Sequence, residues 1–152
     1  MKLAQAIKRG FTLIELLVVI GILAILLAIT LIAINPQRQF QQANDTKRKS
    51  DVNTILNAVG QYAADNNGAL PAGVTAVDQE VSSVGADICN ALVPTYIAAL
   101  PVDPTTGTGA AIATCPVAPA TYVTGYNIIS TNNRVTVSAP SAQITTPITV
   151  TR

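Results

Sequence analysis

The stretch Gly10 to Ile34 reads GFTLIELLVVIGILAILLAITLIAI, and Glu15 carries its only charged side chain. From Phe11 onward this apolar run is about 24 residues long. Because a helix rises about 1.5 Å per residue, the run would be about 36 Å long and could cross a hydrocarbon core of about 30 Å. The stretch therefore predicts a membrane-spanning helix.

Glu15 is the residue of this run that a plain membrane anchor does not explain. A charged side chain near the bilayer centre costs about 2.5 to 3.5 kcal/mol on insertion scales, and less near the interface. We therefore take Glu15 as a candidate functional residue. The ten residues before the run, MKLAQAIKRG, are basic and end in Gly10, whose small size leaves the backbone accessible to a peptidase.

The run Lys8 to Ile20, KRGFTLIELLVVI, resembles the class III signal of type IV pilins and type II secretion pseudopilins. The resemblance implies that a prepilin peptidase cleaves between Gly10 and Phe11 and that the new amino terminus of Phe11 is methylated. It also implies that Glu15 pairs with the amino terminus of Phe11 during assembly. Four residues separate the two groups, so the paired terminus could belong to the same subunit or to a neighbour.

The resemblance also implies a location and a set of partners. Basic residues flank both ends of the run, so the charge rule does not decide its orientation. From the family we expect a precursor in the inner membrane with a cytoplasmic N-terminus, and an extracellular filament after assembly. The expected partners are other copies of the chain, joined as a helical homopolymer through their N-terminal helices, the prepilin peptidase, the inner-membrane assembly platform, and membrane lipid before assembly.

Four segments are expected along the chain: a cleaved leader at 1–10, the transmembrane or filament-core half of one long helix at 11–34, its amphipathic outer half at 35–67, and a small loop-and-strand globular part at 68–152. Pro36 predicts a kink or local break in the helix. Apolar residues recur at spacings of three and four, which predicts a face that packs in a core; they are Phe40, Ala43, Val52, Ile55, Leu56, Val59, Tyr62 and Ala63.

The basic cluster Lys47-Arg48-Lys49 is expected to form a solvated helix face. In a filament it could instead pair with acids of neighbouring subunits, such as Asp45 or Asp51. Loss of the leader removes three basic residues and leaves six basic against eight acidic side chains. No strong signal for nucleic-acid binding remains.

The segment from Leu70 onward is rich in Gly, Pro, Ser, Thr and β-branched residues. We expect a loop over 70–85, a short helix from Asp87 to Leu92 capped by Asp87, and a hairpin of strands 121–130 and 134–139. A weaker strand over 144–151 would lie at an edge, because Pro140 and Pro147 exclude it from a central position. The predicted fold class is α+β, a pilin-like long N-terminal helix packed against a small antiparallel sheet.

The segment Tyr96 to Pro104, YIAALPVDP, resembles the tyrosine and Leu-Pro-x-Asp-Pro segment of many pseudopilins and small pilins. That family often continues with Trp-Gly, whereas this chain has Thr105-Thr106-Gly107. Asp103 is expected to cap a turn.

Cys89 and Cys115 are the only cysteines of the chain. Because the outer side of the membrane is oxidising, a disulfide is expected, and two buried free thiols are the alternative. The chain has no histidine, no Gly-rich phosphate loop between a strand and a helix, and only scattered carboxylates in its outer part. We therefore expect no catalytic residue, no metal site, no cofactor and no enzymatic activity.

The leading hypothesis is a structural subunit, a pilin, of a type IV pilus. One alternative is a pseudopilin of a type II secretion or DNA-uptake machine. An alternative of another class is a minor adhesive or ligand-binding subunit, and a further one is a signal-anchored protein that never polymerises. Glu15 is the feature that the last alternative leaves unexplained.

Overall fold

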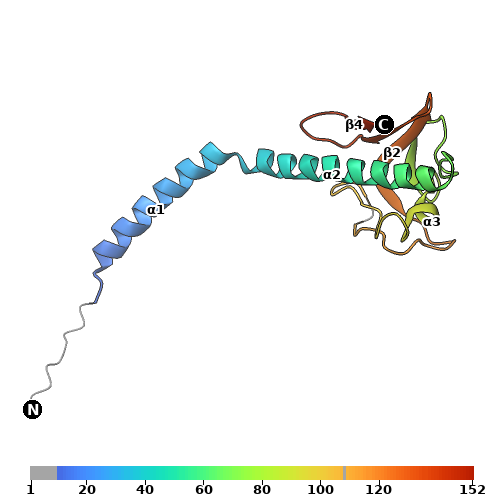
Figure 1. Ribbon diagram of the computed structural model, residues 1–152. Helices are drawn as coiled ribbons and strands as arrows, with labels where there is room; N and C mark the ends of the chain where they lie inside the picture. The colour runs from blue at the N-terminus through green and yellow to red at the C-terminus, as the bar shows by residue number, and fades with distance from the viewer. Residues whose placement is uncertain (1–9, 108) are drawn as a thin grey trace, which may run out of the picture. The chain divides into compact units, whose positions relative to one another are not determined.

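The computed structural model describes residues 10–107 and 109–152. The predicted leader, residues 1–10, thus lies outside the described residues except for Gly10, and so do the basic residues Lys2, Lys8 and Arg9. The chain divides into two compact units, Met1–Gln39 and Phe40–Arg152. The first contains the apolar helix, and the second contains the sheet and the core (Figure 1).

Helix α1 spans Leu13–Ile34, which confirms the predicted apolar helix. It begins with a capping box in which the side chains of Thr12 and Glu15 each accept a backbone hydrogen bond from the other residue. By length and composition α1 is long and apolar enough to cross a membrane, and no other helix among the described residues is.

The chain leaves helical geometry at Asn35, one residue before Pro36. Asn35 has φ 45° and ends α1, and helix α2 then spans Pro36–Asp65. The residue before a proline is disfavoured in the helical region, asparagine tolerates a left-handed conformation, and proline is well suited to the first position of a helix. Asn35 also caps α2, since its side-chain Oδ1 accepts a long hydrogen bond from the backbone N–H of Arg38 at 3.4 Å. The sequence had predicted a kink or break at Pro36.

Helix α2 buries one face against the sheet, and this face begins later than its apolar pattern predicted. Phe40 is 72% exposed and Ala43 is also exposed, because the second unit covers the helix only from about Asp45 onward. The rest of the predicted stripe is buried or half-buried. The helix ends at Asn66-Asn67-Gly68, as predicted, where Asn67 and Gly68 have positive φ and the N–H of Gly68 donates to the carbonyl of Ala63 at 2.7 Å.

Four antiparallel strands form a sheet in the order β1-β2-β3-β4: β1 Gln79–Ser82, β2 Val123–Thr131, β3 Arg134–Ala139 and β4 Ile148–Thr151. The β2–β3 hairpin confirms the predicted strand pair. Its turn residues Asn132 and Asn133 have φ 52° and 59°, the left-handed values that a two-residue hairpin turn requires. β4 lies at the edge, as predicted, but starts only after Pro147.

Strand β1 was wrongly predicted to be part of a loop. Its four residues, QEVS, show little alternation, and the register against β2 shifts between Glu80 and Ser82. The strand exists because it pairs with β2, more than 40 residues later in the chain. Such long-range pairing leaves little signal in a short local window.

The core lies between the buried face of α2 and one face of the sheet. It also takes in helix α3, Cys89–Leu92. The fully buried side chains include Val52, Ile55 and Val59 of α2, Tyr126 and Ile128 of β2, Val137 of β3, and Ile88 and Leu92 at α3. This arrangement confirms the predicted α+β class.

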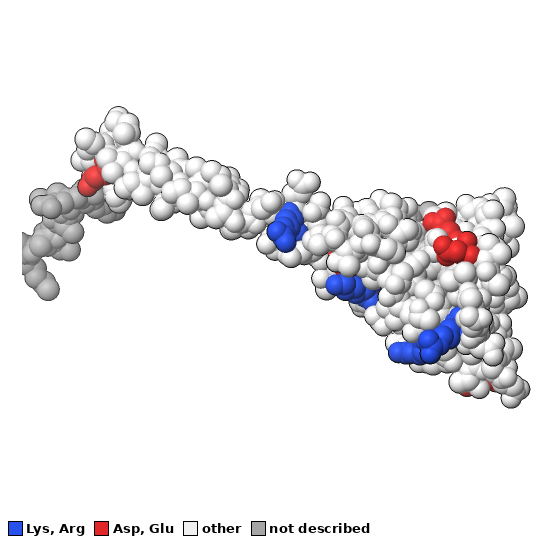
Figure 2. All heavy atoms as spheres, turned by 90° about the horizontal axis from the view of Figure 1, so that it is seen from above, with Lys and Arg blue, Asp and Glu red and all other residues white. Residues whose placement is uncertain are grey.

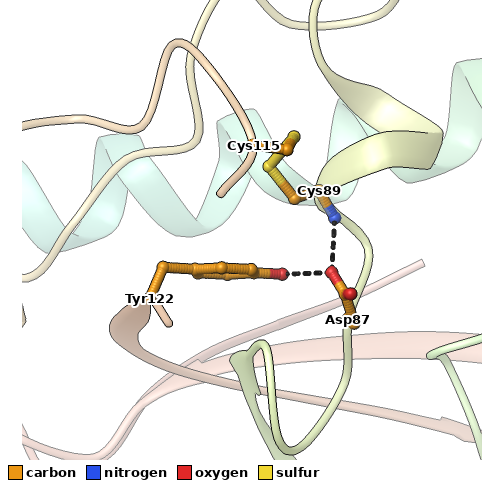
Figure 3. The surroundings of a disulfide bond; sticks show 4 residues. All are labelled: Asp87, Cys89, Cys115 and Tyr122. Atoms are coloured by element: carbon orange, nitrogen blue, oxygen red, sulfur yellow. Dashed lines mark hydrogen bonds between the residues drawn. A yellow bond between two sulfur atoms is a disulfide. The ribbon is translucent and has the colours of Figure 1, made fainter. Parts of the chain in front are cut away.

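The region of α3 differs from its prediction in one respect. The helix starts at Cys89 rather than Asp87, and Ile88 takes the capping position. Asp87 instead lies where its Oδ1 accepts a hydrogen bond from the Tyr122 hydroxyl at 2.7 Å and a long one from the Cys89 N–H at 3.4 Å (Figure 3). Burial, followed by the Asp87 carboxylate, raises the pKa of Tyr122 above its ordinary range.

The predicted disulfide joins Cys89 to Cys115 across a sequence separation of 26 (Figure 3). It ties α3 to a long stretch that contains one isolated bridge, between Leu100 and Ile112, before β2. Few regular hydrogen bonds hold this stretch, so the covalent link limits its freedom in the unfolded chain.

We expect the double variant Cys89→Ala, Cys115→Ala to lose about 3 to 4 kcal/mol of unfolding free energy, the entropy of closing a loop of this size. All four tyrosines lie in the second unit, so near-ultraviolet circular dichroism of the full chain in non-ionic detergent reports its unfolding in guanidinium. Reductant should lower the midpoint of the wild type and leave the variant unchanged. Equal midpoints for the two proteins would show that the disulfide contributes no stability.

Candidate assembly site

The Glu15 side chain is held in the first turn of α1 by Thr12. Its Oε2 accepts from the Thr12 backbone N–H at 2.8 Å and from the Thr12 hydroxyl at 2.7 Å. The Glu15 N–H in turn donates to the Thr12 hydroxyl oxygen at 3.3 Å. The carboxylate therefore stands at the positive end of the helix, and Oε1 makes no hydrogen bond with any described residue. Thr12 was not singled out from the sequence, although Thr-x-x-Glu is the pattern of a capping box.

The residues of the predicted processing site lie beside this turn. Gly10 and Phe11 precede α1 outside any helix, and both are exposed. Phe11 and Glu15 line one shallow hollow together with Ile14, Val18 and Val19. The structure thus brings Phe11 and Glu15 together, and it leaves the Gly10–Phe11 peptide bond open to a protease.

The apolar surface of α1 is uncovered along its whole length. None of its residues is buried, and its large apolar side chains are at least half exposed, with Ile32 reaching 84%. Figure 2 shows the visible face of α1 without charge except for one acidic group near its N-terminal end. A surface of this size and character is stable only against lipid or other apolar helices.

Residues 6–31 match the model of the prokaryotic N-terminal methylation motif. The chain carries the class III signal of type IV pilins and pseudopilins. No curated protein sequence and no solved structure gives a significant match to the chain. The motif includes Gly10, Phe11 and Glu15, and it marks a membrane-anchored, pilin-like precursor of a structural kind.

In this pilin-like chain Arg48 does not lie on a solvated face, contrary to the prediction. Its side chain is 0% exposed. Nε donates to Oδ2 of Asp103 at 2.6 Å, Nη1 donates to Oδ1 of Asp45 at 2.9 Å, and Nη2 donates to the Thr105 hydroxyl at 2.6 Å. Asp45 is therefore paired within its own chain. The sequence signal was present but weak: Asp45, Arg48 and Val52 follow each other at helical spacing on the buried face.

Lys47 is also paired within the chain. Its Nζ donates to Oδ2 of Asp51 at 2.6 Å and to the carbonyl oxygen of Val102 at 2.8 Å. The Tyr126 hydroxyl donates to the same Asp51 oxygen at 2.7 Å. Lys47 nevertheless stays exposed, with 49% of its side chain accessible, and Lys49 is exposed without a charged partner among the described residues. The expected solvated face therefore holds for Lys47 and Lys49 and fails for Arg48.

The two carboxylates bound to Arg48 each hold a separate loop. Asp45 accepts backbone hydrogen bonds from Gln143 at 2.9 Å and Ile144 at 2.8 Å. Asp103 accepts from the backbone N–H groups of Thr105 at 2.8 Å and Thr106 at 3.0 Å, so it does cap a turn as predicted. The sequence analysis missed that one buried guanidinium joins both loops to α2.

Gly125 of β2 allows the Asp103 turn to approach the sheet. It has φ 79°, and a Cβ placed there would lie 2.8 Å from the Cβ of Asp103. The Asp103 N–H donates to the carbonyl oxygen of Thr124 at 2.8 Å at the same place. A side chain at position 125 would be strained in its backbone and would push the turn away.

The pKa values of these acids reflect a balance between burial and hydrogen bonding. Burial alone would raise the pKa of Asp103, but the hydrogen bonds from Arg48, Thr105 and Thr106 outweigh it and hold the pKa well below its usual range. The same balance, with backbone donors from Gln143 and Ile144 ahead of Arg48, lowers the pKa of Asp45. Both acids are therefore charged at neutral pH, and the cluster is ionic.

We expect Asp103→Asn to lower the unfolding free energy of the second unit by about 3 to 5 kcal/mol, because it leaves the buried Arg48 charge short of a partner. Glu80→Gln is the matched control: Glu80 is an exposed acid whose side chain makes no hydrogen bond with the described residues, so its change should stay within about 0.5 kcal/mol. Denaturant unfolding followed by the tyrosine signal measures both. Equal effects of the two substitutions would show that the Arg48 cluster is not needed for stability.

Proposed function

We propose that this chain is a structural subunit, a pilin, of a type IV pilus, matured by cleavage between Gly10 and Phe11. The observation that carries the proposal is α1: 22 residues of exposed apolar helix with one carboxylate held in its first turn. A plain anchor needs the apolar surface but not the carboxylate. A filament subunit uses both, the surface to pack against other copies and the acid to align them.

The proposed assembly step moves α1 from lipid into a bundle of identical helices. Lipid and helix surfaces are similarly apolar, so the gain comes from close packing and from polar contacts between helices. Cleavage at Gly10 would create an amino group on Phe11, the residue beside Thr12, whose N–H already binds Glu15. With Oε1 of Glu15 uncommitted, an amino terminus can bind there as a charge-assisted hydrogen bond, whether from the same subunit or from a neighbour.

The proposed location follows from the same features. Before assembly α1 would hold the precursor in the inner membrane, with the N-terminus cytoplasmic and the second unit outside. The disulfide fits an oxidising compartment for that unit. The proposed partners are further copies of the chain, the prepilin peptidase that also methylates Phe11, and the inner-membrane assembly platform.

The second candidate function is that of a pseudopilin in a secretion or DNA-uptake machine. The segment Leu100 to Pro104 resembles the Leu-Pro-x-Asp-Pro segment that pseudopilins and small pilins share, so it is compatible with this candidate as well as with the pilin. Its Asp103 is tied to Arg48 in the core. Abundant long surface filaments made of this chain would support the pilin, and short or scarce filaments would support the pseudopilin.

Substitution of Glu15 tests the assembly role directly. We expect Glu15→Val to be inserted and cleaved normally but to reduce filament yield at least tenfold, because helices would pack without a fixed register. Thr30→Val is the matched control, since it also replaces a polar group of α1 by valine and removes only a local hydrogen bond to Leu27. Filaments sheared from cells and measured against total chain give the yield. Wild-type yield from Glu15→Val would refute the registry role.

Substitution of Gly10 tests the processing site. We expect Gly10→Leu to leave a precursor that is heavier by the ten-residue leader, because the bulky side chain blocks the peptidase. Intact mass of the membrane fraction measures this, and sheared wild-type filaments should contain a chain that begins at Phe11. Gly21→Leu, at an open position within α1, should still be cleaved. Mature-size protein from Gly10→Leu would place the cleavage elsewhere.

A further inference from the structure

A hollow of about 340 Å³ lies in the second unit, between the C-terminal half of α2 and the β2–β3 hairpin. Its apolar lining comes from Leu56 and Val59 of α2, Val135 of β3 and Leu70 of the loop between α2 and β1. Leu56, Val59 and Val135 are almost fully buried, so the hollow reaches down to the core. Its size is at the low end of the roughly 300 to 1,000 Å³ typical of small-molecule sites.

The helix wall of this hollow is open because Gly60 has no side chain. A Cβ placed on Gly60 would meet no atom within 4 Å. A glycine inside a helix costs about 1 kcal/mol relative to alanine, and neither close packing nor backbone strain requires one here. Gly60 also lines a second hollow of about 410 Å³ together with Asn57, Gln61 and Ala64. The two hollows therefore adjoin at this glycine.

The guanidinium at the rim belongs to Arg152, which lines both hollows. Its Nη1 donates to Oδ1 of Asn57 at 2.5 Å. The other two guanidinium nitrogens, Nε and Nη2, make no hydrogen bond with the described residues, and no Asp or Glu side chain there pairs with Arg152. This differs from Arg48 and Lys47, both of which have acids of their own. Ser130 and Asn133 add a hydroxyl and an amide to the lining.

We propose that this hollow binds a small amphipathic carboxylate. The apolar body lies on Leu56, Val59 and Val135, and the carboxylate accepts two hydrogen bonds from the free edge of the Arg152 guanidinium. A guanidinium matches a carboxylate in a two-point geometry, and an apolar floor with few polar groups at its rim is the usual form of a ligand site. An unpaired cation beside a pre-formed apolar hollow selects an acid over a neutral or cationic ligand.

The proposal does not depend on assembly, since no lining residue of either hollow belongs to α1. The full chain, dispersed in non-ionic detergent, is titrated with 4-fluorophenylacetate, and binding is followed by fluorine NMR of the ligand. Empty micelles of the same detergent give the partition background. We expect saturable binding above that background, and binding at least several-fold weaker for the neutral analogue 2-(4-fluorophenyl)ethanol.

Two pairs of variants, each a test with its control, show whether the ligand binds in this hollow. Arg152→Gln should weaken binding about tenfold, the usual effect of losing a charge-assisted contact, whereas Arg134→Gln, an exposed arginine that lines neither hollow, should not. Gly60→Leu should fold normally and abolish binding by filling the hollow, whereas Asn53→Leu on the exposed face of α2 should not. Near-ultraviolet circular dichroism confirms that each variant is folded. Binding equal in all four variants, or no binding above empty micelles, would overturn the proposal and leave the filament proposal intact.

Discussion

The buried Arg48 guanidinium is the interaction on which the second unit depends. It joins α2 to the turn at Asp103, 55 residues further along the chain, and through Asp45 to the loop at Gln143, which lies 98 residues after Asp45. Neither loop belongs to a regular strand. The carboxylates of Asp103 and Asp45 therefore accept hydrogen bonds from backbone N–H groups that strand pairing would satisfy in a sheet. A buried guanidinium is stable only when its N–H groups have hydrogen-bond acceptors. No buried side-chain nitrogen or oxygen among the described residues lacks a hydrogen-bond partner.

This arrangement explains why a unit with a modest sheet can be well ordered. The four strands and the buried face of α2 form the core of the unit. The ionic cluster around Arg48 and the disulfide hold the irregular segments outside that core. The two devices act on different parts of the chain. The disulfide restricts the stretch after α3 in the unfolded state, whereas the cluster selects one conformation of two loops in the folded state.

Local patterns predicted the parts of the molecule whose structure is set locally. The apolar run, the end of α2 at Asn66-Asn67-Gly68 and the hairpin around Asn132 and Asn133 could all be read from short windows, because capping and turn geometry depend on neighbouring residues. Strand β1 and the pairing of Arg48 with Asp103 could not, since both depend on residues more than 40 positions away. At the candidate assembly site, Glu15 stood out for its charge, but Thr12, which holds it, was overlooked.

The two units differ in how far contacts within the chain cover their apolar surfaces and pair their charged groups. In the second unit the apolar face of α2 is covered from about Asp45 onward, and the buried charges there have partners within the chain. In the first unit α1 buries no residue, and Glu15 is bound on one oxygen only. Because no residue of α1 is buried, the free energy of covering it comes from contacts with other molecules, first lipid and then, under the proposed function, other copies of the same helix. Under the proposed function, the Glu15 carboxylate would serve only the second of these environments, and the chain would be adapted to leave the membrane as well as to enter it.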